Sequence, residues 1–149
     1  MLSEKTNSTV LFLCTGNYYR SRFAEIYFNW LAERGRLTWR ADSRGLALDP
    51  GNFGPLSLHT RLELERLKIP VPHPLRDPLD AAVRDFKAAR LIIALKEAEH
   101  RRLMEARFPE WAERVEYWHV HDLDFADASE ALPQVKVHVE ELVVRLRGE

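Results

Sequence analysis

The sequence predicts an α/β fold in which a parallel sheet carries helices on both faces. Residues 10–13 and 91–95 form short, continuously apolar runs, which are typical of strands buried on both faces. Segments with helical spacing of apolar residues separate and follow these runs, and strands that alternate with helices pair in parallel through right-handed crossovers. The length of 149 residues, 46% of them hydrophobic, suits a single core. We therefore expect one domain over residues 1–149, in which residues 1–8 form a flexible tail.

The first strand is expected to lead through a short loop into a helix. The apolar run stops at Cys14, and the loop comprises residues 15–19. Gly35 marks the expected end of the helix. The helix itself is predicted by five apolar residues that recur on one helical face, namely Phe23, Ile26, Tyr27, Trp30 and Leu31.

The middle of the chain is expected to hold one strand and two helices. A second strand is predicted at residues 37–41, before a surface loop at 45–55 that is rich in glycine and proline. A helix follows at about 56–68, and a short helix at about 79–87. Between these helices, four prolines prevent regular structure, namely Pro70, Pro72, Pro74 and Pro78.

The last third of the chain repeats the order of strand and helix. The strand at 91–95 precedes a helix that runs to about Arg107, and residues 115–120 are the expected last strand. In such a sheet, ligands bind at the carboxyl ends of the strands, which directs attention to Cys14. The closing helix is marked by an apolar stripe of Val135, Val139, Leu142 and Leu146.

Charge and cysteine content exclude several classes of function. The formal net charge of -1 supplies no basic field for nucleic acid or an acidic membrane. The single cysteine, Cys14, excludes an intrachain disulfide, a CxxC redox pair and a multi-cysteine zinc site. No apolar stretch reaches the roughly 18 residues of a membrane span, and Glu4 stands where a signal peptide carries only bases. We therefore expect a cytoplasmic protein that binds neither nucleic acid nor membranes.

The segment from Cys14 to Ser21 carries the residue types that bind a phosphate and attack it. A loop wrapped over a helix N-terminus turns backbone N–H groups inward, and the helix dipole adds to their attraction for an anion. Gly16 allows backbone angles that other residues resist, and Asn17 suits a left-handed turn. Arg20 adds a planar fork for two phosphoryl oxygens. Because this positive field favours the thiolate, Cys14 is expected to be a nucleophile.

Cys14 could instead have a purely structural role, because a cysteine that ends a buried strand is usually an inert small hydrophobe. The strand before it, the helix after it, and the spacing to Arg20 and Ser21 together favour the reactive interpretation. The nucleotide-binding patterns GxxxxGK[ST] and GxGxxG are absent. The loop is therefore expected to bind phosphate without a nucleotide.

Residues 10–25 read VLFLCTGNYYRSRFAE. This run resembles the opening signature of the low-molecular-weight protein tyrosine phosphatases, (V/I)LFVC-x-GN-x-CRSP-x-AE. Further matches lie at residues 39–43, at Ile69-Pro70 followed by His73 and Arg76, and at 92–95, so that the similarity covers nearly the whole chain. The resemblance implies a three-layer domain with a four-stranded, parallel, twisted sheet and a phosphate-binding loop after the first strand. It also implies a cytoplasmic enzyme that needs no metal and no cofactor.

The resemblance implies a role for each residue of the loop. Cys14 would be the nucleophile and Arg20 the phosphate clamp, while Ser21 would donate a hydrogen bond to the Cys14 sulfur and ease its departure from phosphorus. The other residues that would surround the substrate phosphate are Thr15, Gly16, Asn17, Tyr18 and Tyr19.

A supporting network is implied as well. Asn17, Ser43 and His73 would hold the loop in shape through hydrogen bonds, with Glu25 as the partner of His73. Taken alone, Ser43, His73 and Glu25 would be a loop serine, a solvated histidine and a helix-surface acid.

The general acid is expected after the last strand, where the family keeps an Asp-Pro pair. The Asp-Pro pairs at residues 49–50 and 77–78 lie in earlier loops, where they are turn and helix-start signals. Matching the last strand places Asp122 at the acid position, with Leu123 in place of the proline. Two further aspartates stay as alternatives, Asp124 and Asp127.

The same segment also holds residue types that bind metals. His119 and His121 lie beside Asp122 and Asp124, and alternate residues of a strand share a face. The HxHxDH spacing of dinuclear hydrolases is not met, so we expect no metal.

Three further positions depart from the family pattern. Arg22 replaces the proline after Arg-Ser, as a cation that either recruits an acidic substrate or is solvated. Lys96 replaces an aspartate after the third strand. Tyr19 replaces a second loop cysteine, so no intrachain disulfide can protect Cys14 from over-oxidation.

We therefore expect a protein-tyrosine phosphatase that acts through a cysteinyl-phosphate on a phosphotyrosine protein or a small aryl phosphate. Two other functions stay open. A non-catalytic phosphate- or phosphopeptide-binding module is favoured by Leu123, Lys96 and Arg22. Arsenate reduction would require an external thiol, because Cys14 is the only cysteine.

Overall fold

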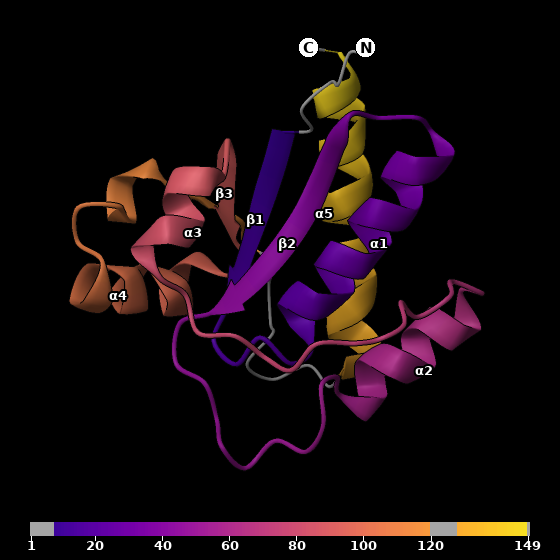
Figure 1. The fold of residues 1–149 in the computed structure, drawn as a ribbon, viewed down its shortest axis with the longest axis horizontal. Coiled ribbons are helices and arrows are strands. Elements are labelled where there is room, and N and C mark those ends of the chain that lie inside the picture. Colours follow the sequence, from indigo (N-terminus) through magenta and orange to yellow (C-terminus); the bar gives the residue numbers. More distant parts are fainter. Residues whose placement is uncertain (1–7, 120–127, 149) are drawn as a thin grey trace.

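A four-stranded parallel sheet forms the centre of the computed structural model, which describes residues 8–119 and 128–148 (Figure 1). The strand order is β2-β1-β3-β4, and all three neighbouring pairs are parallel. The strands are β1 (Ser8–Cys14), β2 (Trp39–Gly45), β3 (Leu91–Ala94) and β4 (Glu116–Tyr117).

Helices cover both faces of the sheet, as Figure 1 shows. Helices α1 and α5 lie on one face, with α2 packed beside them, while α3, α4 and the 3-10 turn η1 lie on the other. The predicted three-layer α/β fold is thereby confirmed. The helices are α1 (Arg20–Arg34), α2 (Leu58–Arg66), α3 (Val83–Ala88), α4 (Glu97–Arg107), η1 (Ala112–Arg114) and α5 (Ala128–Arg147).

Strand β1 is buried on both faces, which explains its continuous apolar run. Val10, Phe12 and Cys14 pack into the core beneath α1 and α5. Leu11 and Leu13 point into the opposite core, which α3, α4 and η1 complete. The Cys14 side chain at the end of this strand therefore packs into the core beneath α1 and α5, which is the larger of the two.

Strand β2 lies further along the chain than the predicted 37–41. Its side chains alternate between buried and half-buried positions, as expected at a sheet edge. The sequence did not predict the second half of this strand, because its residues are polar or glycine and have low β-propensity. The actual register sets Ser43 beside Phe12 and Gly45 beside Cys14. The edge strand β2 therefore places the polar side chain of Ser43 near the end of β1.

Three other boundaries differ from expectation. Helix α2 begins after Ser57, whose hydroxyl accepts the Thr60 N–H. Helix α3 starts four residues later than predicted, because the chain from Leu79 to Ala81 runs extended and exchanges backbone hydrogen bonds with Gly45. Strand β4 is shorter than the predicted 115–120, of which residue 120 lies outside the described part.

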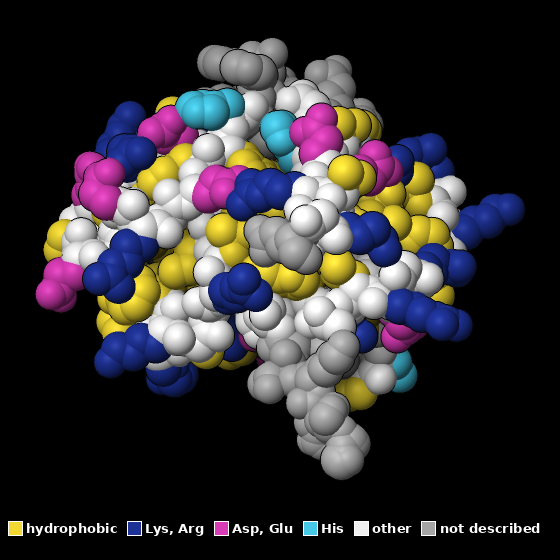
Figure 2. All heavy atoms as spheres, turned by 90° about the horizontal axis from the view of Figure 1, so that it is seen from above, with side chains coloured by type: hydrophobic (Ala, Val, Ile, Leu, Met, Phe, Trp, Pro, Cys, Tyr) yellow, Lys and Arg dark blue, Asp and Glu magenta, His cyan; other side chains and the backbone are white. Residues whose placement is uncertain are grey.

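The strands point their carboxyl ends toward the loop that follows β1 (Figure 1). Figure 2 views the molecule from the opposite end, where basic side chains lie scattered among acidic, polar and hydrophobic ones.

None of the helices in residues 8–119 and 128–148 combines the length and apolar content needed to cross a membrane.

Candidate active site

The loop of residues 15–19 connects Cys14, at the end of β1, to Arg20, the first residue of α1. The carbonyl of Cys14 accepts the Leu46 N–H at 2.9 Å, and the carbonyl of Thr15 accepts the Ala47 N–H at 2.9 Å. Because a peptide unit is planar and trans, a carbonyl that faces outward turns the next N–H to the opposite side. The N–H groups of Thr15 and Gly16 are therefore turned inward, as an anion cradle requires.

The Cys14 side chain lies on the floor of this loop and is only 1% exposed. Its sulfur is 2.8 Å from the Ser21 hydroxyl oxygen, in the first turn of α1. A hydroxyl at that distance can donate to a thiolate and to a departing sulfur. The structure thus brings together Cys14, the expected nucleophile, and the serine that the family resemblance paired with it.

Asn17 is the central support of the loop and is fully buried. Its Nδ2 group donates to the hydroxyls of Ser21 and Ser43, at 2.9 Å each. Its Oδ1 accepts from Arg76 and from the Leu79 N–H, at 3.0 Å each. All four hydrogen-bonding positions of the amide are used. Asn17 also adopts the left-handed conformation, with φ of 49°.

Gly16 does not play the part that we expected of it. Its φ is not positive, and an added Cβ would meet its nearest atom at 3.5 Å, an ordinary contact. The glycine that the loop requires is Gly45, at the end of β2. A Cβ there would lie 2.8 Å from the Thr15 carbonyl oxygen and 3.1 Å from the Asn17 Cβ. A glycine at the end of a strand signals such a close backbone approach.

Two half-buried side chains, Glu25 and Arg76, hold Ser43. The Ser43 hydroxyl donates to Glu25 at 2.5 Å, and Arg76 donates to the Ser43 carbonyl at 2.7 Å. Burial raises the pKa of Glu25, while Ser43, Arg22 and Arg76 act in the opposite direction. The expected network of Asn17, Ser43 and Glu25 is therefore assembled, with a different cation at its edge.

That cation is Arg76 in place of His73. The His73 side chain is exposed and makes no hydrogen bond with any described residue, whereas the Arg76 guanidinium lies within 3.4 Å of Glu25. Arg76 reaches Asn17, Ser43 and Glu25 at once, because the guanidinium has five donors and the imidazole ring at most two. The sequence signal was present, since Arg76 belongs to the segment that resembles the family.

Arg22 is neither a solvated charge nor a group that faces substrate. It is 2% exposed, lies 3.4 Å from Glu25, and donates to the carbonyls of Pro55 and Arg76 at 3.3 and 3.0 Å. Burial lowers the pKa of Arg22. This arginine therefore links the start of α1 to the two long loops that pack against it.

Arg20 lies beside Cys14, and its side chain is 12% exposed. Its Nη2 group donates to Glu99 Oε2 at 3.1 Å, while its buried Nε–H meets no acceptor among the described residues. Burial acts to lower the pKa of Arg20, but Cys14 and Glu99 together raise it by more, so the guanidinium stays charged. The Arg20 guanidinium thus keeps one N–H group without an acceptor among the described residues, and an anion site requires such a donor.

Glu99, in the first turn of α4, was missed by the sequence reasoning. Its carboxylate accepts from the Thr15 hydroxyl and from Arg20, and the buried His100 Nε2 lies 3.4 Å away. The pKa of Glu99 is strongly lowered, chiefly by His100 and further by Arg20 and Thr15, although burial opposes them. An acid in a first helical turn is common, so only the fold distinguishes this one.

A cavity of about 250 Å³ opens above the thiol. The hydroxyl of Tyr18 donates to the Phe53 carbonyl at 2.5 Å, and the Arg20 guanidinium lies 5.6 Å from the centre of the Tyr19 ring. The cavity is lined by Cys14, Thr15, Gly16, Tyr18, Tyr19, Arg20, Ala47, Asp49 and Asn52. Asp49 and Asn52, from the loop after β2, were not among the expected site residues.

The expected general acid lies in the part of the chain that the structure does not describe. Asp122 and its alternatives Asp124 and Asp127 lie outside the described residues, as do Leu123 and His121. His119 is exposed, with its Nε2 3.2 Å from Glu97. Within the described ranges, no group of three or more His, Cys, Asp or Glu side chains is arranged to hold a metal ion.

Comparison with known proteins identifies the family. The family model described as low molecular weight phosphotyrosine protein phosphatase matches residues 9–147. A search of curated proteins found no match.

Solved structures share the fold. YfkJ from Bacillus subtilis is 22% identical with a TM-score of 0.80, and the match covers 98% of both chains. A low molecular weight protein tyrosine phosphatase from T. tengcongensis is 23% identical, with a TM-score of 0.76 over 93% of this chain and 99% of that one. The YwlE arginine phosphatase from Geobacillus stearothermophilus is 18% identical, with a TM-score of 0.72 over 95% and 94%. With a cysteine and an arginine at the two ends of the loop after β1, and a family model that spans most of its length, the chain belongs to the low molecular weight phosphotyrosine protein phosphatase family.

Proposed function

We propose that this cysteine-dependent phosphatase removes phosphate from phosphotyrosine in proteins or from small aryl phosphates. One observation carries the proposal: the buried Nε–H of Arg20 has no acceptor among the described residues, and Arg20 lines the cavity that opens over Cys14. Buried donors are almost always satisfied, so an unfilled one beside a nucleophile indicates the place of a ligand oxygen. A phosphoryl group supplies such an oxygen and places its phosphorus near the sulfur.

The walls of the cavity support an aromatic leaving group. Tyr18 and Tyr19 both line it, and the hydrogen bond from the Tyr18 hydroxyl to the Phe53 carbonyl holds the Tyr18 ring in place. Aromatic rings prefer offset-stacked or edge-to-face contacts with other rings. The phenyl group of phosphotyrosine would therefore be gripped beside the loop.

The reaction would proceed in two displacements at phosphorus. The Cys14 thiolate attacks phosphorus, the bond to the phenolic oxygen breaks, and the general acid gives its proton to that oxygen. Arg20 and the inward N–H groups stabilise the charge on the phosphoryl oxygens. Water, deprotonated by the same carboxylate, then attacks the cysteinyl-phosphate, and the sulfur leaves as a thiolate that accepts a hydrogen bond from Ser21.

We propose Asp122 as the general acid and base. Its support is its position after the last strand, at the place of the family's acid. Asp49 is the rival that the described residues supply, because it lines the cavity, although its carboxylate accepts the Gly51 N–H at 2.8 Å. Replacement of Asp122 by asparagine should slow the release of poor leaving groups far more than good ones. An equal effect on both, or a larger one in Asp49→Asn, Asp124→Asn or Asp127→Asn, would reassign the acid.

The activity itself is tested with para-nitrophenyl phosphate. We expect turnover that resists EDTA, is inhibited by vanadate and is lost in Cys14→Ser. Turnover retained in that variant would overturn the mechanism. Phosphate binding without turnover in the intact protein would identify a binding module, and arsenate-dependent oxidation of an added thiol would identify a reductase.

Substrate class is tested by comparing peptides. A phosphotyrosine peptide should be hydrolysed faster than the same peptide with phosphoarginine, because the cavity presents aromatic walls. The reverse order would assign this chain the activity that names the YwlE arginine phosphatase. The cytoplasmic location expected from the sequence stays a prediction, to be checked by cell fractionation.

A further inference from the structure

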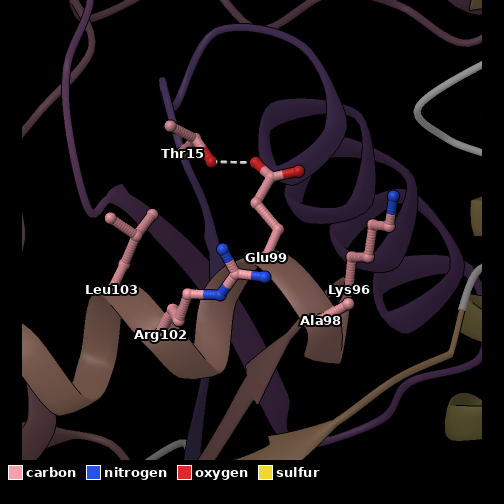
Figure 3. Close-up of a pocket in the computed structure, with 6 residues that line it drawn as sticks. All are labelled: Thr15, Lys96, Ala98, Glu99, Arg102 and Leu103. Carbon is pink, nitrogen blue, oxygen red and sulfur yellow. Dashed lines mark hydrogen bonds between the residues drawn. The ribbon is translucent and has the colours of Figure 1, made fainter.

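Glu99 contacts two residues at the phosphate loop that are distant from it in the sequence, and it lies next to its neighbour His100. The Thr15 hydroxyl of the phosphate loop donates to its carboxylate, the Arg20 Nη2 group donates to it at 3.1 Å, and His100 Nε2 lies 3.4 Å away. Figure 3 shows Glu99 rising from α4 toward Thr15, beside Arg102 and Lys96. One carboxylate thus connects α4 to both ends of the loop that carries Cys14.

The buried ring of His100 lies beside this carboxylate. The ring is fully buried, and its Nδ1 accepts the Lys96 N–H at 3.0 Å, so the proton of the neutral ring is on Nε2. Burial is the main cause that lowers the pKa of His100, which keeps the ring neutral. Nε2 lies 3.4 Å from the Glu99 carboxylate, although it makes no hydrogen bond with any described residue. A buried N–H group therefore lies next to the Glu99 carboxylate.

The contact with Arg20 leaves the arginine's binding edge open. A group that competed with phosphate would occupy both Nε and Nη2, the two donors that together form the fork. Glu99 contacts Nη2 alone, and Nε stays without an acceptor among the described residues. Because Nη2 has a second hydrogen and Nε–H has no acceptor among the described residues, Arg20 still has N–H groups that can donate to phosphoryl oxygens.

We propose that Glu99 is a positioning residue that orients Arg20 for the phosphoryl group and ties down the first residue of the loop through Thr15. This inference rests on the proposed function, whose phosphate site it completes. Its carboxylate borders a second cavity, of about 380 Å³, that shares Thr15 with the site but does not include Cys14. Glu99 therefore lies outside the cavity that Cys14 lines.

The test removes the carboxylate and follows both binding and turnover. Glu99→Ala and Glu99→Gln should lower kcat for para-nitrophenyl phosphate by about 10–100-fold, as expected for a misoriented catalytic group. Glu105→Gln, the same change of charge at an exposed position of α4, should leave kcat unchanged. Unchanged kcat in both Glu99 variants, or an equal loss in Glu105→Gln, would overturn the proposal.

Orthophosphate binding separates this proposal from the proposed function, because it needs no turnover. In Cys14→Ser protein, titration calorimetry should show that Glu99→Gln weakens orthophosphate binding by about tenfold. Tighter binding would mean that Glu99 competes with phosphate, and unchanged binding that it does nothing for Arg20; both results contradict the proposal. If the parent chain failed to hydrolyse any phosphate ester, the proposed function would fail while this measurement still tested Glu99.

A double-mutant cycle shows whether Glu99 acts through Arg20. In an Arg20→Lys background, whose side chain lacks the fork, Glu99→Gln should change orthophosphate binding less than twofold. A purely structural role would give the same loss in both backgrounds and would overturn the proposal.

Discussion

The two sides of the phosphate loop are built differently. On the side of β2, Asn17, Ser21 and Ser43 are all fully buried, and every polar atom of the Asn17 side chain has a partner. On the side of α4, the Glu99 side chain is 31% exposed and borders a cavity. We infer that the buried side fixes the shape of the loop, while the open side orients the charge that meets phosphate.

This contrast predicts that changes on the buried side reduce stability and activity together, whereas changes on the open side affect activity more than stability. The reason is that an orphaned buried polar group costs its full desolvation, while an exposed one regains water.

The largest loss of stability is expected for Asn17→Ala. It removes four hydrogen bonds, leaves their partners buried, and places alanine at a positive φ. We expect a loss of roughly 2–4 kcal/mol in the free energy of unfolding, measured by urea denaturation. A midpoint within experimental error of the parent protein would show that the buried side does not carry the stability we assign to it.

Gly45→Ala should cost somewhat less. Its Cβ would approach the Thr15 carbonyl oxygen and the Leu48 side chain at 2.8 and 2.6 Å, so the loop must shift. We expect a loss of about 1–3 kcal/mol in the free energy of unfolding, with reduced turnover. Gly16→Ala is the matched control, since its Cβ meets only ordinary contacts and its denaturation midpoint should move little.

Arg76→Ala and His73→Ala compare the cation found with the cation expected. Arg76 contacts Asn17, Ser43 and Glu25, so its loss should destabilise the fold by about 1–2 kcal/mol and slow turnover. His73 is exposed, and His73→Ala should leave both the melting temperature and turnover unchanged. An effect confined to His73→Ala would restore the original expectation.

The smallest effect is expected on the open side, as a dependence on pH. The pKa of Glu99 is lowered in the folded state from 4.5, so its ionised form stabilises the fold. This contribution is fully present above pH 4.5 and is lost below it, as the unfolded chain takes up the proton first. Thermal melts of the parent protein and Glu99→Gln should therefore differ most near pH 7 and converge as pH falls below 4.5. A difference that grows on acidification would contradict the sign.

The part of the site that is contiguous in the sequence was predictable. Strand β1, the loop and α1 place Cys14, Asn17, Arg20 and Ser21 within eight residues, and the structure brings them together as expected. Local geometry explains this success, because a strand end followed by a helix start can arrange these groups in few ways.

Residues contributed by distant elements were predicted less well. The resemblance named Ser43 and Glu25, which the structure brings together, but it paired Glu25 with His73, and the structure pairs Glu25 with Ser43 and Arg76. Arg76 was present in the matching segment without a role, since spacing alone cannot show which of two cations reaches a buried amide. Glu99 gave no signal at all, because an acid in the first turn of a helix usually serves the helix dipole.

Arg22 shows the same limit from another direction. A cation that replaces a proline in a first helical turn would ordinarily be solvated, yet it is buried against Glu25 and two carbonyls. The loops that bury it come from residues 55 and 76, and no local pattern indicates that they cover this turn.

By itself, the sequence determined the α/β class, the loop that follows β1, and the cysteine and arginine at its two ends, because these depend on periodicity and on residues that are neighbours in the chain. Only the tertiary structure decided which residues contact that loop from other elements, namely Arg76 and Gly45 on the side of β2 and Glu99 on the side of α4. The physical reason is that hydrogen bonds, ion pairs and close backbone approaches depend on distances of a few ångströms between segments, and the parallel sheet sets those distances when it joins β1 to β2 and β3.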